Sequence, residues 1–185
     1  MITNLKIKDS FLIDHQSFSD ERGYFSEYLQ HDFRIQNLGN FIQQNLSQSK
    51  KYVLRGLHFQ EGSFAQAKLV TVMKGSIYDF FIDLRSDSPT YLQSDVVFLT
   101  DSSLQSVFVP TGCAHGFFTL EDDNRVLYSV SLPRATEYER IINPIPLLES
   151  EVFIKRIPPI NIRDITISNK DRNAPKLEEY LKNII

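Results

Sequence analysis

The sequence predicts an all-β fold, a sandwich or a barrel, and three observations lead to this expectation. Short apolar-rich runs alternate with polar turn residues along most of the 185 residues. Those runs recur about every ten residues, which is typical of all-β domains. Signals for helix starts are few. Because no internal repeat, low-complexity tract or linker interrupts this pattern, we expect one domain over residues 1–185.

The clearest strand candidates lie in the middle of the chain. Two apolar-rich runs, residues 68–73 and 77–84, are separated by a short connection that contains Gly75. Such a connection is typical of a β-hairpin, so we expect the two runs to pair with each other. A polar loop over residues 85–90 follows. Three further runs are rich in β-branched and aromatic residues and are also expected to be strands: residues 94–99, 106–109 and 125–131.

Two segments have helical features. Residues 27–36 follow a turn and are expected to form a short helix. The C-terminal segment 173–182 begins with Asn173, a residue type that caps helices, and has a proline two positions later. Its apolar residues then recur at helical spacing. We therefore expect the β domain to end in a short helical tail.

Composition and charge exclude several classes of protein. The chain is 42% hydrophobic and 23% charged, which is ordinary for a globular domain and unlike a disordered or fibrous protein. A net charge of -3 argues against non-specific binding to nucleic acid. No apolar run approaches the roughly 20 residues that cross a bilayer, and the N-terminus lacks the apolar stretch of a signal peptide. With a single cysteine, Cys113, and therefore no internal disulfide, we expect a cytoplasmic protein without a membrane partner.

Two histidines occupy similar surroundings. His58 follows a glycine in an apolar run, and so does His115. This placement suits polar groups that point into the pocket of a barrel, although hydrogen-bonded histidines of the core would look the same. A metal site is disfavoured because such sites need three or four protein ligands, and the residue two positions after His58 is Gln60, a poor ligand. We expect no metal.

Three basic residues lie in or near the same segments: Arg22, Arg55 and Lys68. Guanidinium groups that converge bind the oxygens of a diphosphate well. Solvated surface charge would explain each residue equally well. Arg55 stands at an odd separation from His58, and residues of an extended strand share a face only at even separations, so Arg55 need not face the pocket with His58.

Seven short motifs follow one another along nearly the whole chain. They are DERGYFSE at 20–27, FIQQNLSQS at 41–49, LRGLHFQ at 54–60, AKLV at 67–70, DLRSDSPT at 83–90, PTGCAHGF at 110–117 and SNKD at 168–171. In this order and with these gaps, they resemble the dTDP-4-dehydrorhamnose 3,5-epimerase family. The resemblance implies a cupin-like antiparallel jelly-roll barrel and a homodimer. It also implies a nucleotide-diphosphate 4-keto sugar as substrate, and neither a metal nor an organic cofactor.

The resemblance also implies catalytic roles. His58 would be the general base, Asp171 its carboxylate partner, and Tyr128 the acid that returns a proton from the opposite face of the sugar. A hydrogen next to a ketone is acidic because the carbanion delocalises into an enolate, which Lys68 would stabilise electrostatically. A histidine, with an ordinary pKa of about 6.5, suits the base. A tyrosine, with a pKa of about 10, suits the acid when nearby positive charge lowers that value.

Further positions match residues that bind the nucleotide sugar in the family. His115 would lie near the sugar. The others would contact the nucleotide and phosphates, the last three of them from the partner subunit: Gln43, Asn45, Arg55, Lys170, Arg22, Phe25 and Glu27.

The chain departs from the family pattern at three positions. Arg134 stands six residues after Tyr128, where a second aromatic residue is usual. We include Arg134 among the substrate-binding residues and expect it to affect which sugar is accepted or which carbon is inverted. Asn143 replaces an aspartate before Pro144, and Leu46 stands where a histidine is common.

Several functions remain open on the sequence. The leading hypothesis is inversion at C3 and C5 of dTDP-4-dehydro-6-deoxy-glucose for surface polysaccharide biosynthesis. Its rival is a GDP-linked 4-keto sugar such as a heptose, with inversion at one carbon only as a further variant. A sugar 3,4-ketoisomerase would move the carbonyl instead of inverting a centre. A non-catalytic binding protein for nucleotide sugars should lack the combination of His58, Asp171 and Tyr128.

Overall fold

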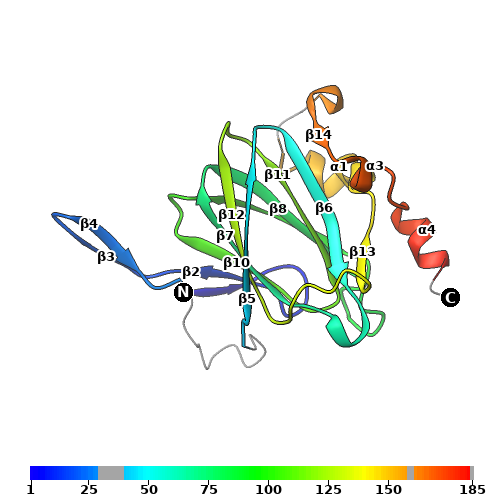
Figure 1. Cartoon of the computed structure of the whole chain (residues 1–185), viewed down its shortest axis with the longest axis horizontal. Helices are drawn as coiled ribbons and strands as arrows, with labels where there is room; N and C mark the ends of the chain where they lie inside the picture. The colour runs from blue at the N-terminus through cyan, green and yellow to red at the C-terminus, as the bar shows by residue number, and fades with distance from the viewer. Residues whose placement is uncertain (29–39, 158–160, 184–185) are drawn as a thin grey trace.

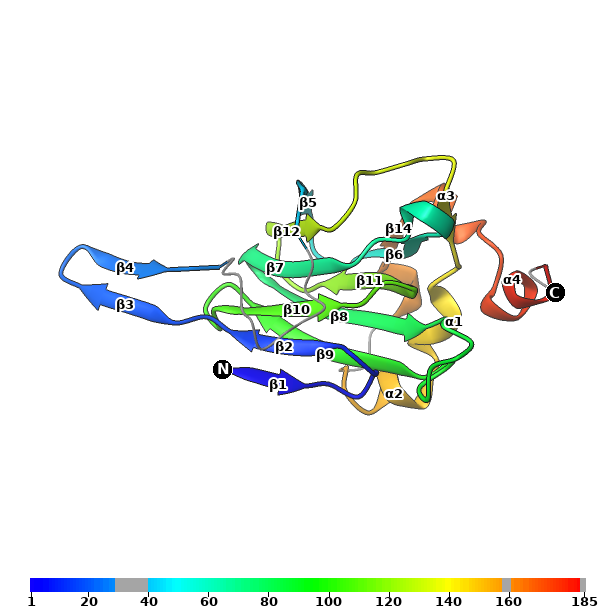
Figure 2. The same cartoon turned by 90° about the horizontal axis from the view of Figure 1, so that it is seen from below.

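Two β-sheets face each other in the computed structural model, which describes residues 1–28, 40–157 and 161–183 (Figures 1 and 2). The first sheet has the strand order β1-β2-β10-β7-β12-β5. The second has the order β13-β6-β11-β8-β9, with β14 also paired to β6. Every pairing between described strands is antiparallel except that of β14 with β6. The all-β jelly-roll prediction is confirmed.

The strands of the first sheet are β1 (Ile2–Asn4), β2 (Phe11–Asp14), β10 (Gln105–Val109), β7 (Lys68–Lys74), β12 (Asn124–Val130) and β5 (Gln43–Ser49). Those of the second are β13 (Glu139–Ile141), β6 (Val53–Gln60), β11 (Cys113–Thr119), β8 (Ser76–Asp83), β9 (Ser94–Thr100) and β14 (Thr166–Ile167). A separate hairpin consists of β3 (Ser17–Asp20) and β4 (Gly23–Ser26). The α-helices are α1 (Ile145–Leu148), α2 (Glu151–Ile154), α3 (Asn169–Arg172) and α4 (Leu177–Lys182), and two 3₁₀ turns cover Gly62–Phe64 and Ile162–Asp164.

The five predicted strands and the C-terminal helix are confirmed, as β7, β8, β9, β10, β12 and α4. The helix begins four residues later than expected, where the backbone N–H of Lys176 donates to the Glu179 carboxylate at 2.9 Å. Of the helix expected over residues 27–36, only residues 27 and 28 are described, and neither is helical. The rest of that prediction lies outside the described residues.

The hairpin predicted between residues 68–73 and 77–84 is wrong. Strand β7 belongs to the first sheet and β8 to the second, so Gly75 turns the chain from one sheet into the other. Its φ is 82°, and a Cβ there would lie 2.6 Å from Oδ1 of Asn124. The requirement for glycine is therefore genuine, but a tight corner between sheets needs it as much as a hairpin does.

Two large clusters and one small cluster of buried apolar side chains form the core of the described residues, and the small one contains Ala67, Leu69 and Phe108. The two large clusters lie in separate layers. One cluster lies between the sheets and includes Val70 and Val126 from the first sheet and Phe81 and Phe117 from the second. The other lies on the outer face of the second sheet, beneath the helices. There the ring of Phe80 meets that of Phe153 on α2, with 4.9 Å between centroids. The helices cover the outside of the second sheet and leave the inter-sheet space to the strands.

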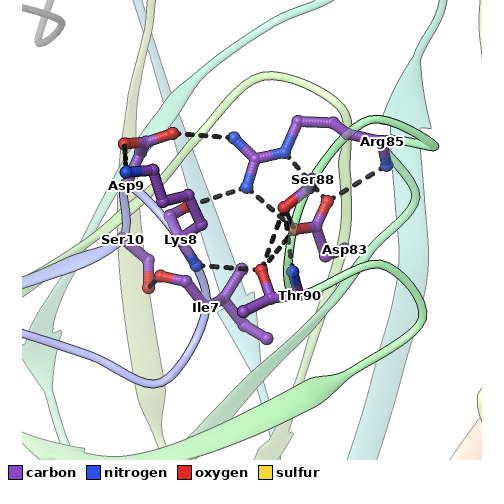
Figure 3. Close-up of polar contacts among 8 residues, drawn as sticks. All are labelled: Ile7, Lys8, Asp9, Ser10, Asp83, Arg85, Ser88 and Thr90. Atoms are coloured by element: carbon purple, nitrogen blue, oxygen red, sulfur yellow. Dashed lines mark hydrogen bonds and ion pairs between the residues drawn. The ribbon is translucent and has the colours of Figure 1, made fainter.

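The motif over residues 83–90 stabilises the fold away from that space (Figure 3). The carboxylate of Asp83 is fully buried and accepts hydrogen bonds from Arg85, Ser88 and Thr90 at 2.6–2.9 Å. Arg85 also donates to Asp9 at 3.1 Å, which ties the N-terminal segment to the end of β8. Burial alone would raise the pKa of Asp83, but these hydrogen bonds outweigh it and lower the pKa to about 2.

The hairpin of β3 and β4 projects from the body of the molecule in both views (Figures 1 and 2). Its aromatic side chains are exposed to solvent: Phe18 by 51%, Tyr24 by 60% and Phe25 by 63%. The rings of Phe18 and Phe25 contact each other with 6.4 Å between centroids. A projecting hairpin with this much exposed apolar surface is unusual for a monomer and typical of an interaction surface.

Candidate active site

A cavity of about 810 Å³ is lined by strands of both sheets, and this volume is typical of small-molecule sites. Nine of the residues singled out in the sequence line it: Asn45, Arg55, His58, Lys68, His115, Tyr128, Arg134, Lys170 and Asp171. Gln43 lies next to this set, because its amide donates to Oδ1 of Asn45 at 2.7 Å. The structure therefore gathers residues that span most of the chain into one place.

His58 and Asp171 form a hydrogen-bonded pair, although 113 residues separate them. Nε2 of His58 lies 2.8 Å from Oδ1 of Asp171. The Asp171 side chain is almost fully buried, whereas that of His58 is 36% exposed. Burial would raise the pKa of the Asp171 carboxyl, but hydrogen bonds from His58 and from the backbone of Gly56 outweigh burial and hold the pKa below its usual value. Asp171 is therefore a carboxylate that fixes the tautomer of His58 with Nε2 protonated and Nδ1 free for a ligand.

Local structure brings Asp171 to β6. Strand β14 pairs in parallel with the start of β6, where Thr166 is opposite Val53, and it leads directly into α3 (Figure 1). Ser168 caps α3 by accepting the backbone N–H of Asp171 at 3.0 Å. The SNKD motif is thus a helix cap that turns the Asp171 carboxylate towards the strand that carries His58.

Tyr128 lies on the other side of the cavity. It belongs to β12 of the first sheet, whereas His58 belongs to β6 of the second. Its hydroxyl lies 3.2 Å from the hydroxyl of Ser47, and its ring contacts those of His115 and Phe117, with 6.2 Å between centroids in each case. Burial raises the pKa of Tyr128, although Ser47 and the charge of Arg55 oppose this shift. The expected lowering of the pKa is therefore wrong for this structure, because desolvation exceeds the effect of the positive charge.

Lys68 reaches across the cavity from β7. Its Nζ donates to the backbone carbonyl of His58 at 2.8 Å. Burial lowers the pKa of Lys68 to about 8, and the negative charges of Asp79 and Glu139 moderate this shift. Near pH 7 the group remains mostly protonated, so it supplies one positive charge beside His58.

His115 is nearly inaccessible to solvent, at 3% exposure, and forms a second histidine–carboxylate pair. Its Nε2 lies 2.6 Å from Oδ2 of Asp79, which is fully buried. Burial lowers the pKa of His115, and the charge and hydrogen bond of Asp79 oppose that shift. Asp79 was not among the residues predicted from the sequence, although an aspartate flanked by Tyr78 and Phe80 in an apolar run is a signal for a buried carboxylate that needs a partner.

Arg55 lines the same cavity as His58, although the odd separation between them gave no reason to expect this from strand alternation alone. The ladder between β6 and β11 is irregular between His115 and Phe117, opposite this stretch. A Cβ on Gly56 would lie 2.5 Å from Cα of Gly116, and one on Gly116 would lie 2.5 Å from the Arg55 carbonyl oxygen. The irregularity breaks the alternation of a regular strand. Arg55 then donates to the Ser49 hydroxyl at 2.9 Å.

Arg134, Glu139 and Lys170 form a charged group at the edge of the cavity. Both cations contact Oε2 of Glu139, Arg134 at 3.3 Å and Lys170 at 2.8 Å. The side chains of the two cations are more than half exposed, whereas that of Glu139 is 15% exposed. Gln60 holds the adjoining loop, because its side chain accepts the N–H of Ala135 at 2.7 Å and donates to the Pro133 carbonyl. With two positive charges and one negative, the group retains one net positive charge at the cavity.

Arg22, Phe25 and Glu27 are not brought to the cavity of their own chain. Arg22 and Phe25 belong to the projecting hairpin and its turn, and Glu27 follows β4. Arg22 contacts the Asp20 carboxylate within the same turn. Leu46 is 64% exposed on β5.

Two further findings concern metals and membranes. Among the residues that the structure describes, no group of three or more histidine, cysteine, aspartate or glutamate side chains could hold a metal ion. Within the same residues, no helix has the length and apolar character of a membrane span.

Comparison with known proteins agrees with this site. Residues 4–179 match the family model of dTDP-4-dehydrorhamnose 3,5-epimerase. The Salmonella typhimurium protein of that name is 36% identical over 184 residues, which cover 98% of this chain and 97% of the relative. The solved epimerase from Elizabethkingia anophelis has a TM-score of 0.85 at 33% identity, with 96% of each chain covered.

A second solved structure includes a sugar nucleotide. The dTDP-6-deoxy-D-glucose-3,5-epimerase of Legionella pneumophila, in complex with dTDP-4-keto-L-rhamnose, has a TM-score of 0.85 at 31% identity, with 96% of this chain and 93% of that chain covered. These matches confirm the cupin-like jelly roll that the resemblance implied. The chain belongs to the dTDP-4-dehydrorhamnose 3,5-epimerase family and is an isomerase.

Proposed function

We propose that this protein inverts C3 and C5 of dTDP-4-dehydro-6-deoxy-glucose, and that it supplies a deoxy sugar for surface polysaccharide. The observation that carries this proposal is the placement of a histidine–carboxylate pair and a tyrosine on opposite sides of one cavity: His58 with Asp171 on the second sheet, and Tyr128 on the first. Inversion of a carbon requires removal of a proton from one face and its replacement from the other. A base and an acid that face each other across the ligand meet that requirement.

The proposed reaction begins at Nδ1 of His58, the ring nitrogen not bonded to Asp171. This nitrogen takes the proton from the carbon next to the 4-keto group, and the electron pair of the broken C–H bond delocalises onto the keto oxygen. The Asp171 carboxylate stabilises the imidazolium that results. Tyr128 then donates its phenolic proton to the opposite face of the same carbon, which restores the ketone with inverted configuration. Burial raises the pKa of Tyr128, so its hydroxyl is protonated before the enolate forms, although the same shift makes it a weaker acid.

Lys68 would stabilise the negative charge of the enolate, and His115 would lie near the sugar. Lys68 is held 2.8 Å from the His58 carbonyl and is mostly protonated near pH 7. Its charge therefore lies close to the carbon that is deprotonated, where a fixed charge in a partly desolvated site is most effective. The buried pair of His115 and Asp79 limits the orientation of the sugar next to Tyr128.

The polar residues towards the edges of the cavity would bind the nucleotide diphosphate. Arg55 is anchored to Ser49 and lines the cavity on the β6 side, and Gln43 and Asn45 lie together on β5. Arg134 and Lys170 share the charge of Glu139 and leave one positive charge in excess. Positive charge of this kind suits phosphate oxygens. Arg134 would lie where its guanidinium limits the choice of sugar or base.

A homodimer would complete the nucleotide site. Arg22, Phe25 and Glu27 are remote from the cavity of their own chain, and the hairpin that carries the first two exposes its aromatic rings. We therefore expect the hairpin to reach the cavity of a second copy, and light scattering to give the mass of two chains. Phe25→Ala should raise KM about tenfold with kcat nearly unchanged, because the hairpin binds substrate without touching the reacting carbons. A single-chain mass at assay concentration would exclude this arrangement.

Proton NMR in deuterated water tests the proposed function. With dTDP-4-dehydro-6-deoxy-glucose, we expect solvent deuterium at C3 and C5 and a product inverted at both carbons. Exchange at one carbon only would restrict the activity to a single inversion. Turnover of a GDP-linked 4-keto sugar, with none of the dTDP sugar, would transfer the proposal to that substrate. A 3-keto product would identify a ketoisomerase, and no exchange with either substrate would contradict the epimerase assignment.

A further inference from the structure

Asn143 lies between the strand that pairs with His58 and the segment that carries Asp171. It lies two residues after the end of β13, whose last residue, Ile141, is opposite His58 in the ladder with β6. The next residue, Ile142, exchanges two backbone hydrogen bonds of 2.9 Å with Leu57. Asn143 is thus the first residue beyond the pairing that holds the backbone on both sides of His58.

On its other side, Asn143 holds the segment that carries Asp171. We call residues 166–175 the strap, since they contain β14 and α3 and run along the edge of β6. The side-chain amide of Asn143 donates to the carbonyl of Arg172, the last residue of α3, at 2.8 Å. The backbone N–H of Asn143 donates to the carbonyl of Pro175 at 2.9 Å. The carbonyls at the end of a helix lack partners within the helix, so the amide satisfies an acceptor that would otherwise need water.

Asp171 lies between the two places where the strap is hydrogen-bonded to the second sheet and to Asn143. On one side, β14 pairs with Val53 and Leu54 of β6, and on the other, Asn143 bonds to Arg172 and Pro175. In between, the Asp171 carboxylate accepts hydrogen bonds from Gly56 and His58. Position 143 is also one of the three departures from the family pattern, where asparagine replaces an aspartate. The amide can donate to a carbonyl, and a carboxylate cannot.

We propose that Asn143 is a positioning residue for the catalytic base: its amide fixes α3 relative to β13 and so sets the distance between Asp171 and His58. This inference rests on the proposed function, because it assumes that Asp171 acts on His58 in catalysis. The side chain does not itself line the cavity. Asn143 therefore acts only through the strap.

Asn143→Asp is the sharpest test. The two side chains have nearly the same shape, and the carboxylate can still accept the N–H of Ile145, which lies 3.0 Å from Oδ1 of Asn143. The other carboxylate oxygen would face the Arg172 carbonyl, so two acceptors would repel each other at the end of α3. We expect kcat to fall about tenfold and KM to stay within about twofold, because substrate contacts are unchanged. Asn183→Asp, the same change beyond α4, should leave both constants unchanged.

A double-mutant cycle separates positioning from a loss of stability. In an Asp171→Asn background, Asn143→Asp should lower the residual rate of deuterium exchange by less than about twofold, since the group through which it acts is already gone. An equal tenfold loss in both backgrounds would overturn the proposal and indicate a structural role alone. A kcat within twofold of the original protein for Asn143→Asp would overturn it as well.

The same variants distinguish the failure of this inference from that of the proposed function. If Asp171→Asn keeps full activity, the assignment of His58 and Asp171 as the catalytic pair is wrong. Both the proposed function and the positioning role of Asn143 then fail. If Asp171→Asn loses activity and Asn143→Asp does not, only the positioning role is wrong. The melting temperature of each variant, expected within about 3 °C of the original protein, shows that all of them are folded.

Discussion

Replacing His58 with asparagine is expected to lower kcat for inversion about 1000-fold and to abolish exchange at C3 and C5 together. A general base typically contributes about 10² to 10⁴ in rate, and asparagine cannot take a proton. Asparagine can still donate a hydrogen bond to Asp171, so the strap should stay in place. Substrate affinity should change little because the residues expected to bind the phosphates are untouched. Single-turnover kinetics with NMR detection of deuterium would measure both effects.

His15→Asn is the matched control for that variant. His15 bonds to the Ser106 hydroxyl at 2.7 Å and does not line the cavity, so its replacement should keep kcat within about twofold. Persistence of exchange at one carbon in His58→Asn would show that a second group deprotonates that carbon. His115 would then be the candidate, since it is directly opposite His58 in the ladder and also pairs with a carboxylate. Full activity of His58→Asn would exclude the proposed mechanism, in which His58 is the general base.

The sequence predicts strands well where the apolar runs are long and poorly where pairing depends on distant partners. The runs that become β7, β8, β9, β10 and β12 are visible in the sequence because β-branched and aromatic residues dominate them. The pairing of β7 with β12 and of β8 with β11 is not visible, since neither is local along the chain. Gly75 illustrates the difference: its need for a positive φ can be predicted, but the sheet that the chain enters afterwards cannot.

The residues of the site, like the strands, could be predicted from the sequence only in part. The family resemblance singled out His58, Asp171 and Tyr128, and the structure brings all three to one cavity. Asp79 was missed because its partner, His115, is 36 residues away, so the apolar neighbours of Asp79 indicate burial but do not identify the partner. Strand alternation alone gave no reason for Arg55 to face the cavity with His58, but the ladder of this strand is irregular and both residues line the cavity. Side-chain direction near a bulge depends on the partner strand.

Replacing Tyr128 with phenylalanine is expected to separate deprotonation from inversion. The base on the second sheet remains, so C–H bonds next to the ketone should still be broken. The proton can then return only from the His58 side, which restores the original configuration. We expect deuterium to enter the sugar with retention, at a rate within about tenfold of the original, while the rate of inversion falls at least about 100-fold. Proton NMR of recovered substrate and product distinguishes the two processes.

The outcome for Tyr128→Phe discriminates between chemistry and packing, because phenylalanine keeps the ring that contacts His115 and Phe117 and removes only the hydroxyl. Tyr78→Phe, on the other side of the second sheet next to Phe98, is the matched control and should leave both rates unchanged. Loss of exchange together with inversion would mean that Tyr128 is needed to form the enolate, as a hydrogen-bond donor to the keto oxygen. Inversion at the original rate would place the acid elsewhere, and Lys68, which lines the same cavity and has a pKa of about 8, would then be the candidate donor.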